Sequence, residues 1–139
     1  MPSRGLRVIL DTNLWISFLI RKDHSFLTQL ILSKKVRLLF SEELLKEFIE
    51  VSRRPKFIKY FSGNSVDEIL DIINDFAEFI EVDSVVTACR DEKDNFLLSL
   101  AKDGRADYLI TGDNDLLELN PFGKTKIILL SDFILEVNS

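Results

Sequence analysis

Two aspartates stand just behind apolar segments that have the pattern of buried strands. Asp11 directly follows residues 6–10, and Asp113 comes two positions after the segment 107–111. Ligands of parallel α/β sheets bind at the carboxyl ends of the strands, so both carboxylates are candidates for a site at that edge. The alternative is that Asp11 caps the following helix and that Asp113 belongs to an ordinary Gly-Asp turn.

Two further acids lie on segments that the sequence predicts to be helical. Asp94 has the i, i+3, i+4, i+7 spacing of a buried helix face relative to three apolar residues within 97–101. A charge at such a position is costly unless a partner compensates it, although the first-turn amides of its own helix could do so. Glu47 borders the apolar face of the helix predicted for 41–53, whereas Glu50 points away. Glu47 could therefore reach a cleft, or it could simply be solvated.

If the strands are neighbours, these four carboxylates converge on one cleft and predict a metal site. Two carboxylates about 5 Å apart repel by about 3 kcal/mol at an effective dielectric constant of 20, so the group needs a cation or a proton. The chain has one histidine and one cysteine, and oxygen donors alone favour Mg²⁺ or Mn²⁺ over zinc. The expected chemistry is metal-assisted hydrolysis of a phosphodiester. Asp115, Asp91 and Asp132 are additional acids that could serve as outer ligands, although such residues are more often helix caps or solvated.

The elements that must position these acids follow from alternating apolar patterns. Short apolar segments alternate with helical ones, which predicts an α/β fold with a parallel sheet covered by helices on both faces. We expect one domain over residues 1–139. The predicted strands are 6–10, 36–40, 80–82, 107–111 and 126–130. The predicted helices are 14–20, 25–32, 41–53, 56–61, 65–79 and 94–103, with Gly104 ending the last one.

A basic segment with interleaved aromatic residues follows the helix that carries Glu47. Its cations are Arg53, Arg54, Lys56 and Lys59, and its rings belong to residues 57, 60 and 61. Cations that hold phosphates and rings that stack on bases suit RNA. The net charge is −5, but residues 1–70 carry +4 and residues 71–139 carry −9. The alternative is a short amphipathic helix whose aromatic residues belong to the core.

Several classes of protein are excluded by what the sequence lacks. The single cysteine, Cys89, allows neither an intramolecular disulfide nor a cysteine-based zinc site. The apolar segment 6–10 is too short for the core of a signal peptide, and no apolar run approaches the length of a membrane span. We therefore expect a cytoplasmic protein with no membrane-spanning segment.

Four stretches, in this order along the chain, resemble the PIN domain family (PilT N-terminus), and within it the toxins of toxin–antitoxin pairs, akin to VapC. They are VILDTN (8–13), SEELLKEFIEV (41–51), RDEKDNFLLSLA (90–101) and ADYLITGDNDLL (106–117). The resemblance implies a magnesium-dependent ribonuclease acting on RNA, with a parallel sheet of strand order 3-2-1-4-5. It also implies a homodimer and inhibition by a cognate antitoxin protein.

The resemblance also assigns roles to individual residues. The acidic set of the family falls on Asp11, Glu47, Asp94 and Asp113, which would be catalytic and would hold the metal. Asp115 matches a frequent auxiliary acid. Asn13 and Thr111 match positions that form hydrogen bonds near the metal and would position the substrate.

Two other functions remain open from the residues alone. A haloacid-dehalogenase-like phosphatase also places an Asp after its first strand and a later Gly-Asp turn, but it needs a second Asp where this chain has Asn13. Rapid turnover of a phosphomonoester would favour it. A non-catalytic RNA- or protein-binding module could retain the acidic pocket, and RNA binding without cleavage in Mn²⁺ would favour that function.

Overall fold

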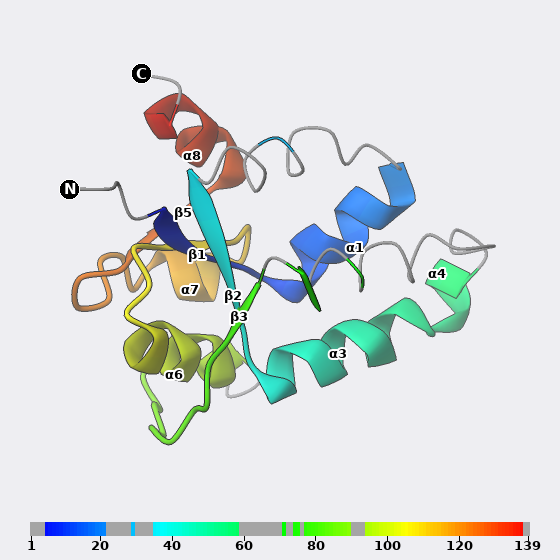
Figure 1. Cartoon of the computed structure of the whole chain (residues 1–139), viewed down its shortest axis with the longest axis horizontal. Helices are drawn as coiled ribbons and strands as arrows, with labels where there is room; N and C mark the ends of the chain where they lie inside the picture. The colour runs from blue at the N-terminus through cyan, green and yellow to red at the C-terminus, as the bar shows by residue number, and fades with distance from the viewer. Residues whose placement is uncertain are drawn as a thin grey trace.

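A five-stranded parallel sheet forms the centre of the computed structural model, which describes residues 5–21, 29, 35–58, 71, 74–75, 77–89 and 94–137 (Figure 1). The strands are β1 (Leu6–Leu10), β2 (Val36–Phe40), β3 (Glu78–Phe79), β4 (Tyr108–Ile110) and β5 (Lys126–Ile128). The described helices are α1 (Thr12–Arg21), α3 (Glu42–Ser52), α4 (Pro55–Ile58), α6 (Asn95–Gly104), α7 (Asn114–Leu117) and α8 (Leu130–Val137). The strand order β3-β2-β1-β4-β5 confirms the expected α/β fold.

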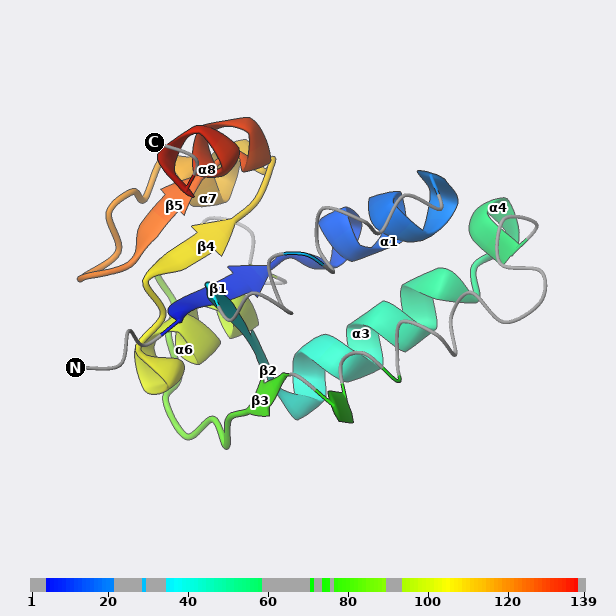
Figure 2. The ribbon, with the colours of Figure 1, turned by 45° about the horizontal axis from the view of Figure 1, so that its top comes forward.

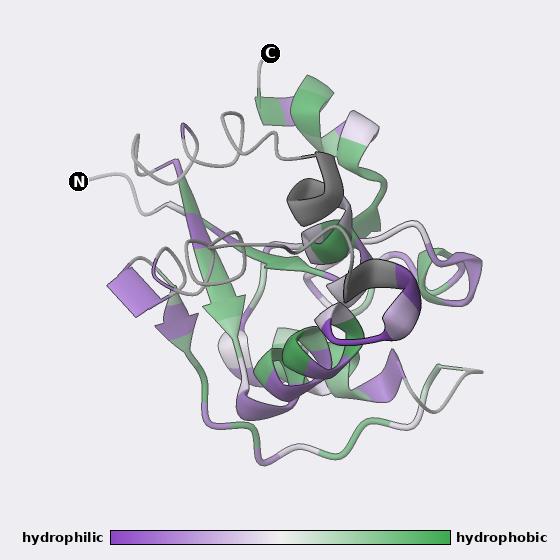
Figure 3. Cartoon of the chain, turned by 90° about the vertical axis from the view of Figure 1, so that its right-hand side faces the viewer, coloured by the Kyte–Doolittle hydropathy of each residue, from purple (hydrophilic) through white to green (hydrophobic). Residues whose placement is uncertain are grey.

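The central strand is covered on both faces. Val8, Ile9 and Leu10 follow one another and are all buried. Because successive side chains of a strand point to opposite faces, consecutive burial requires cover on both sides of the sheet. Figure 3 shows hydrophobic residues along the central strands. This pattern is the one expected of a parallel strand inside an α/β sheet.

The pairing register places the candidate acids at one edge of the sheet. In β1 and β4, Leu10 lies opposite Ile110, so the residues that follow, Asp11 and Thr111, leave the sheet side by side. The backbone N–H of Asp11 donates to the carbonyl of Ile110 at 3.1 Å. Strands β1 and β4 therefore end at the same level of the sheet.

The helices α1 and α3 run alongside each other beyond this edge (Figure 2). Ser41 caps α3, because its hydroxyl oxygen accepts the Leu44 N–H at 3.1 Å, as the sequence predicted. The helices meet through Trp15, whose ring centroid lies 5.3 Å from that of Phe40 and 6.2 Å from that of Phe48. This aromatic contact fixes the position of α3 against α1, and with it the position of Glu47 at the border of the buried face of α3.

Several element boundaries differ from the sequence-based prediction. Helix α1 begins at Thr12 and not at residue 14, because Asp11 caps it. The strand predicted at 80–82 lies two residues earlier, since its residues 78–79 pair with 39–40 of β2. The prediction of strand structure up to residue 130 was wrong, because Leu130 begins α8. Helix α4 covers Pro55–Ile58, one residue earlier than the start predicted for 56–61, and residues 59–61 lie outside the described residues. The helix predicted at 65–79 was wrong at its end, because residues 78–79 form β3. The rest of it and the helix predicted at 25–32 lie largely outside the described residues.

Gly104 does not end α6 in the way the sequence suggested. The residue in the left-handed conformation is Arg105, with φ of 52°. Gly104 is the last helical residue, and a Cβ built on it would meet Leu39 Cδ1 at 3.0 Å and Ile80 Cγ1 at 3.3 Å. Glycine is therefore needed at this position for close packing of α6 against the sheet.

No helix in the described ranges is both long enough and apolar enough to cross a membrane.

Candidate active site at the carboxyl ends of the central strands

Thr111 connects two of the candidate acids. Its hydroxyl donates to Asp11 Oδ2 at 2.5 Å. The hydroxyl oxygen of Thr111 also accepts the backbone N–H of Asp113 at 3.0 Å. The other oxygen of Asp11, Oδ1, accepts the Leu14 N–H at 2.9 Å. Asp11 therefore caps α1, as the alternative interpretation held, and at the same time lies beside the segment that carries Asp113. The two functions do not compete, because they use different carboxylate oxygens.

Asp11 is a buried carboxyl group with another acid near it. Only 6% of the residue is exposed. Burial raises the pKa of Asp11 above its ordinary value, and the negative charge of Asp113 adds to the increase. The hydrogen bonds from Thr111 and from the Leu14 amide lower the pKa, but they offset only part of this increase. A cation at this place would relieve both the burial of the charge and the repulsion.

Glu47 is attached to the same edge of the sheet through Thr12. The hydroxyl of Thr12 donates to Glu47 Oε2, and Thr12 is the buried residue next to Asp11 in the chain. Glu47 is half-buried between the buried residues Leu44 and Val51 of α3, so it borders the apolar face as the sequence predicted. Sequence reasoning missed Thr12, and the only signal for it is a hydroxyl residue directly after the strand-end aspartate.

Asp94 stands at the start of α6. The residues that share its predicted helix face, Leu97, Leu98 and Ala101, are all buried. The side chain of Asp94 makes no hydrogen bond with the first-turn amides of α6, so that alternative explanation is wrong. Its Oδ2 atom is buried and accepts no hydrogen bond, although the residue takes part in other interactions. Asp94 therefore points inward from the helix end, as its spacing suggested.

The expected meeting of all four carboxylates is not present as a finished cluster. Among the residues that the structure describes, no three His, Cys, Asp or Glu side chains lie close enough to hold a metal ion together. Two of the carboxylates form hydrogen bonds within the fold: Thr12 donates to Glu47, and Asp113 Oδ1 accepts the Asp115 N–H at 2.8 Å. That bond caps α7, and Asp115 lies half-buried in its first turn.

The remaining predicted site residues surround this edge. Asn13 is exposed in the first turn of α1, two residues from Asp11. Arg53 and Arg54 are exposed at the end of α3, about 9 Å along the helix from Glu47, and Arg54 forms an ion pair with Glu50 at 3.7 Å. Lys56 is exposed in α4, whereas Lys59 lies outside the described residues.

Comparisons with known proteins identify a family, a sequence relative and a structure with a similar fold. A family model described as PIN domain matches residues 7–115. The uncharacterized protein MJ1680 of Methanocaldococcus jannaschii is 32% identical over 127 aligned positions, and the alignment covers 89% of this chain and 81% of that protein. The crystal structure of PAE2754 from Pyrobaculum aerophilum has a similar fold, with a TM-score of 0.55 at 12% sequence identity, and the match covers 99% of this chain and 95% of that one.

Proposed function

We propose a nuclease function for this chain, because it belongs to the PIN domain family and PIN domains are typically nucleases. The specific activity that we propose is hydrolysis of RNA phosphodiester bonds by a divalent-metal-dependent endoribonuclease. The observation that carries the proposal is the pair of acids at the ends of β1 and β4, in which burial and the charge of Asp113 raise the pKa of Asp11.

The donor set fits a hard divalent cation. Carboxylate oxygens are the ligands that Mg²⁺ and Mn²⁺ prefer, and the raised pKa of Asp11 marks a place where positive charge is favourable. We propose that Asp11, Glu47, Asp94 and Asp113 would hold the ion, with Asp115 as an outer ligand. Because these side chains do not form a finished cluster, ion binding would have to draw Glu47 from Thr12 toward the strand ends.

Individual residues of the chain would have different roles in the hydrolysis of RNA. A bound ion would neutralise the phosphate and activate the attacking water. Thr111 and the Leu14 amide hold the Asp11 carboxylate in one orientation. Asn13, exposed beside Asp11, would donate its side-chain N–H to a phosphate oxygen. The cations at the end of α3 and in α4 would bind phosphates further along the RNA.

Cleavage of a labelled single-stranded RNA with Mg²⁺ or Mn²⁺ tests the activity. We expect Asp11→Asn to lower the rate by more than about a hundredfold, because loss of even an outer partner of a metal ligand costs up to that much. The control is Asp132→Asn, which changes an exposed acid of α8. RNA that is bound in Mn²⁺ and never cut by the wild type would instead favour the non-catalytic binding module.

Thermal unfolding provides a test of the metal that is independent of cleavage. An ion that binds only the folded chain raises its stability by mass action. We expect the melting temperature of the wild type to rise with Mn²⁺ concentration and that of Asp11→Asn to stay constant. An equal rise in both proteins would place the ion elsewhere.

We further propose that the chain is the toxin of a toxin–antitoxin pair and acts in the cytoplasm as a homodimer bound by its antitoxin. The support is the resemblance of its motifs to VapC-like toxins.

Induced expression in bacterial cells should arrest growth when Asp11 is intact and should not arrest it in the Asp11→Asn variant. Sedimentation of the purified protein would test the dimer. Growth at the same rate in both strains would contradict the toxin role.

A further inference from the structure

The carboxylate of Glu47 is held in a different way from those of Asp11 and Asp113. Asp11 and Asp113 each accept a backbone N–H from the first turn of the helix that they cap, at 2.9 and 2.8 Å. Glu47 Oε2 accepts the side-chain hydroxyl of Thr12 instead. A backbone N–H at a helix start keeps its direction as long as the helix persists, whereas a hydroxyl group rotates about one bond. The bond of Glu47 is therefore the one that can open without disturbing a helix.

The backbone of Glu47 is fixed, so any movement of its carboxylate is a rotation of the side chain. The next residue, Phe48, is fully buried, and its ring lies 6.2 Å from that of Trp15 on α1. Glu47 itself is half-buried at the border of the same helix face. A long, unbranched side chain at such a border can change its rotamer while α3 stays packed against α1.

Thr12 and Asp11 are neighbours in the chain but contact different elements. Asp11 Oδ2 accepts the hydroxyl of Thr111 at the end of β4, whereas Thr12, which is 6% exposed, donates to α3. Within the part of the chain that the structure describes, Asp11, Asp113 and Glu47 do not form a group that could hold a metal ion. The position in which Thr12 holds Glu47 is therefore not one that completes a site with the two aspartates.

We propose that the hydroxyl of Thr12 holds Glu47 in a metal-free position and so sets the affinity of the candidate site for a divalent cation. The inference rests on the proposed metal-dependent nuclease function and adds a control of its metal binding. An ion gains Glu47 as a ligand only in the molecules in which this carboxylate has left Thr12. The apparent affinity for the ion is reduced by that fraction.

The opposite role for Thr12 predicts an effect of the opposite sign. If Glu47 kept its bond to Thr12 while it bound the ion, the hydroxyl would orient a metal ligand, as outer partners of metal sites do. Removal of such a partner weakens metal binding by about 10–100-fold. Removal of a hydroxyl that competes with the ion strengthens metal binding. The direction of the change in affinity therefore separates the two roles.

Calorimetric titration with Mn²⁺ in the absence of RNA measures this direction without any cleavage. We expect Thr12→Val to bind Mn²⁺ about tenfold tighter than the wild type. This change corresponds to about 1.4 kcal/mol, close to the contribution of a hydrogen bond to a charged group. Thr12→Ala removes the same hydroxyl with a smaller side chain and should tighten binding in the same way, also where the valine variant does not fold. Thr12→Ser keeps the hydroxyl and should bind Mn²⁺ like the wild type.

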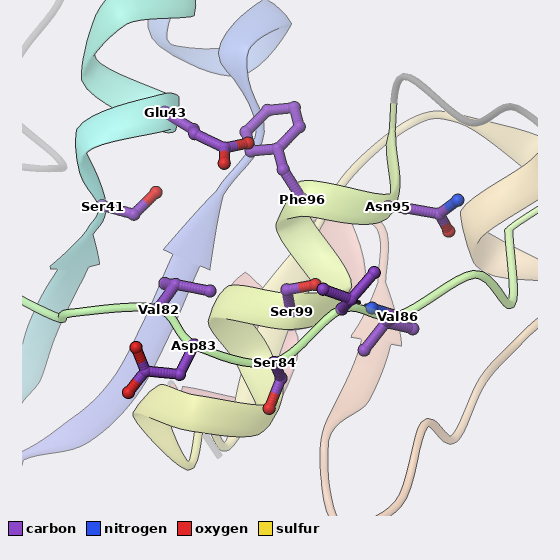
Figure 4. A pocket seen from close by; sticks show the side chains of 10 residues that line it. Ser41, Glu43, Val82, Asp83, Ser84, Val86, Asn95, Phe96 and Ser99 are labelled. Carbon is purple, nitrogen blue, oxygen red and sulfur yellow. Dashed lines mark hydrogen bonds between the residues drawn. The ribbon is translucent and has the colours of Figure 1, made fainter.

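A double-mutant cycle tests whether the hydroxyl acts through Glu47. In a Glu47→Gln background, Thr12→Val should leave the affinity for Mn²⁺ unchanged, because the carboxylate that it releases is absent. The matched background is Glu43→Gln, which removes an acid one turn earlier on α3. Glu43 lines a cavity of about 450 Å³ between the start of α3, the segment 82–86 and the start of α6 (Figure 4). In this background Thr12→Val should still tighten Mn²⁺ binding by about tenfold.

The outcomes separate this proposal from the proposed function. Unchanged or weaker Mn²⁺ binding in both Thr12→Val and Thr12→Ala would overturn the role of Thr12 alone, and weaker binding would make Thr12 a partner that orients Glu47. Tightening that persists in the Glu47→Gln background would also overturn it. Tightening that depends on Glu47, together with RNA that is never cut, would support the role of Thr12 and overturn the ribonuclease function. Absence of Mn²⁺ binding by the wild type and by every variant would overturn both.

Discussion

At the scale of single residues, Thr111 is the most deeply buried polar residue of the candidate site. It is 1% exposed, and its hydroxyl both donates to Asp11 and accepts from the Asp113 backbone. The same oxygen therefore fixes the acid that follows β1 and the chain that follows β4. A hydroxyl is required here because only a group that donates and accepts can serve both neighbours.

We predict that Thr111→Val lowers the free energy of unfolding by about 1–3 kcal/mol. Valine keeps the shape but leaves a buried carboxylate oxygen and an amide N–H without the hydroxyl, and each loss carries a desolvation cost. Thr111→Ser keeps the hydroxyl and should recover most of the loss. Urea denaturation in EDTA measures the difference, and equal stability of the valine variant and the wild type would contradict the role of the hydroxyl.

The raised pKa of Asp11 leads to a second prediction at this scale. The pKa of Asp11 is higher in the folded than in the unfolded chain, so the folded chain binds the proton of this carboxyl group more tightly. The stabilisation that results is present at pH values below the unfolded pKa. It is lost as pH rises through the folded pKa. In EDTA, Asp11→Asn should therefore melt above the wild type at pH 7.5, and the gap should narrow toward pH 4. A variant that melts lower at pH 7.5 would show that the ionised carboxylate is satisfied without a cation.

At the scale of elements, the packing of α6 is decided by a position without a side chain. Gly104 lies against Leu39 of β2 and Ile80, and Arg105 then takes the left-handed conformation that ends the helix. The carbonyl of Gly104 also accepts the Arg7 Nε–H at 2.8 Å. Both contacts fix the carboxyl end of the helix that has Asp94 at its other end.

We predict that Gly104→Ala destabilises the protein by about 1–3 kcal/mol, the usual cost of forcing an extra carbon into a packed interior. In an open helix the same change would stabilise by up to about 1 kcal/mol, so the sign of the effect identifies the close contact. The control is Gly112→Ala, because a Cβ there meets nothing within 4 Å. Chemical denaturation of both variants is the measurement, and a stabilised Gly104→Ala would refute the packing argument.

At the scale of the whole molecule, Arg7 links three parts of the fold. Its guanidinium binds both oxygens of Glu78 at 3.1 and 2.9 Å, and its backbone N–H donates to Asp107 Oδ2 at 2.8 Å. Residues of β1, β3 and the loop before β4 are thus tied together. The hydrogen bond from Arg7 lowers the pKa of Glu78, and the nearby charges of Arg7 and Arg37 add to the effect.

Because the pKa of Glu78 is lowered in the folded chain, its contribution to stability is present above the unfolded pKa and is lost as pH falls through the folded pKa. We predict that Glu78→Gln loses at most about 1 kcal/mol near neutral pH, as is usual for partly exposed ion pairs, and that its acid unfolding is shallower than that of the wild type. Denaturation curves between pH 3 and pH 7 measure this. An unchanged pH dependence would mean that the ion pair of Glu78 with Arg7 does not contribute to the free energy of unfolding.

Much of the fold and part of the candidate site were predictable from local patterns. The apolar segments at 6–10 and 36–40 predicted β1 and β2 with the observed bounds, and Ser41 predicted the start of α3. The strand order came from the resemblance of four motifs to a family. Helix α8 was missed, because its first residue, Leu130, continues the apolar segment that begins in β5.

The sequence by itself determined which residue types stand at strand ends and on inward helix faces, because the periods of strands and helices set these directions locally. Only the tertiary structure decided which atoms meet. Thr12 and Glu47 are 35 residues apart and Thr111 and Asp11 are 100 apart, so their hydrogen bonds depend on strand register and on the packing of α1 against α3. Long-range contacts of this kind follow from how whole elements pack, and no local pattern encodes them.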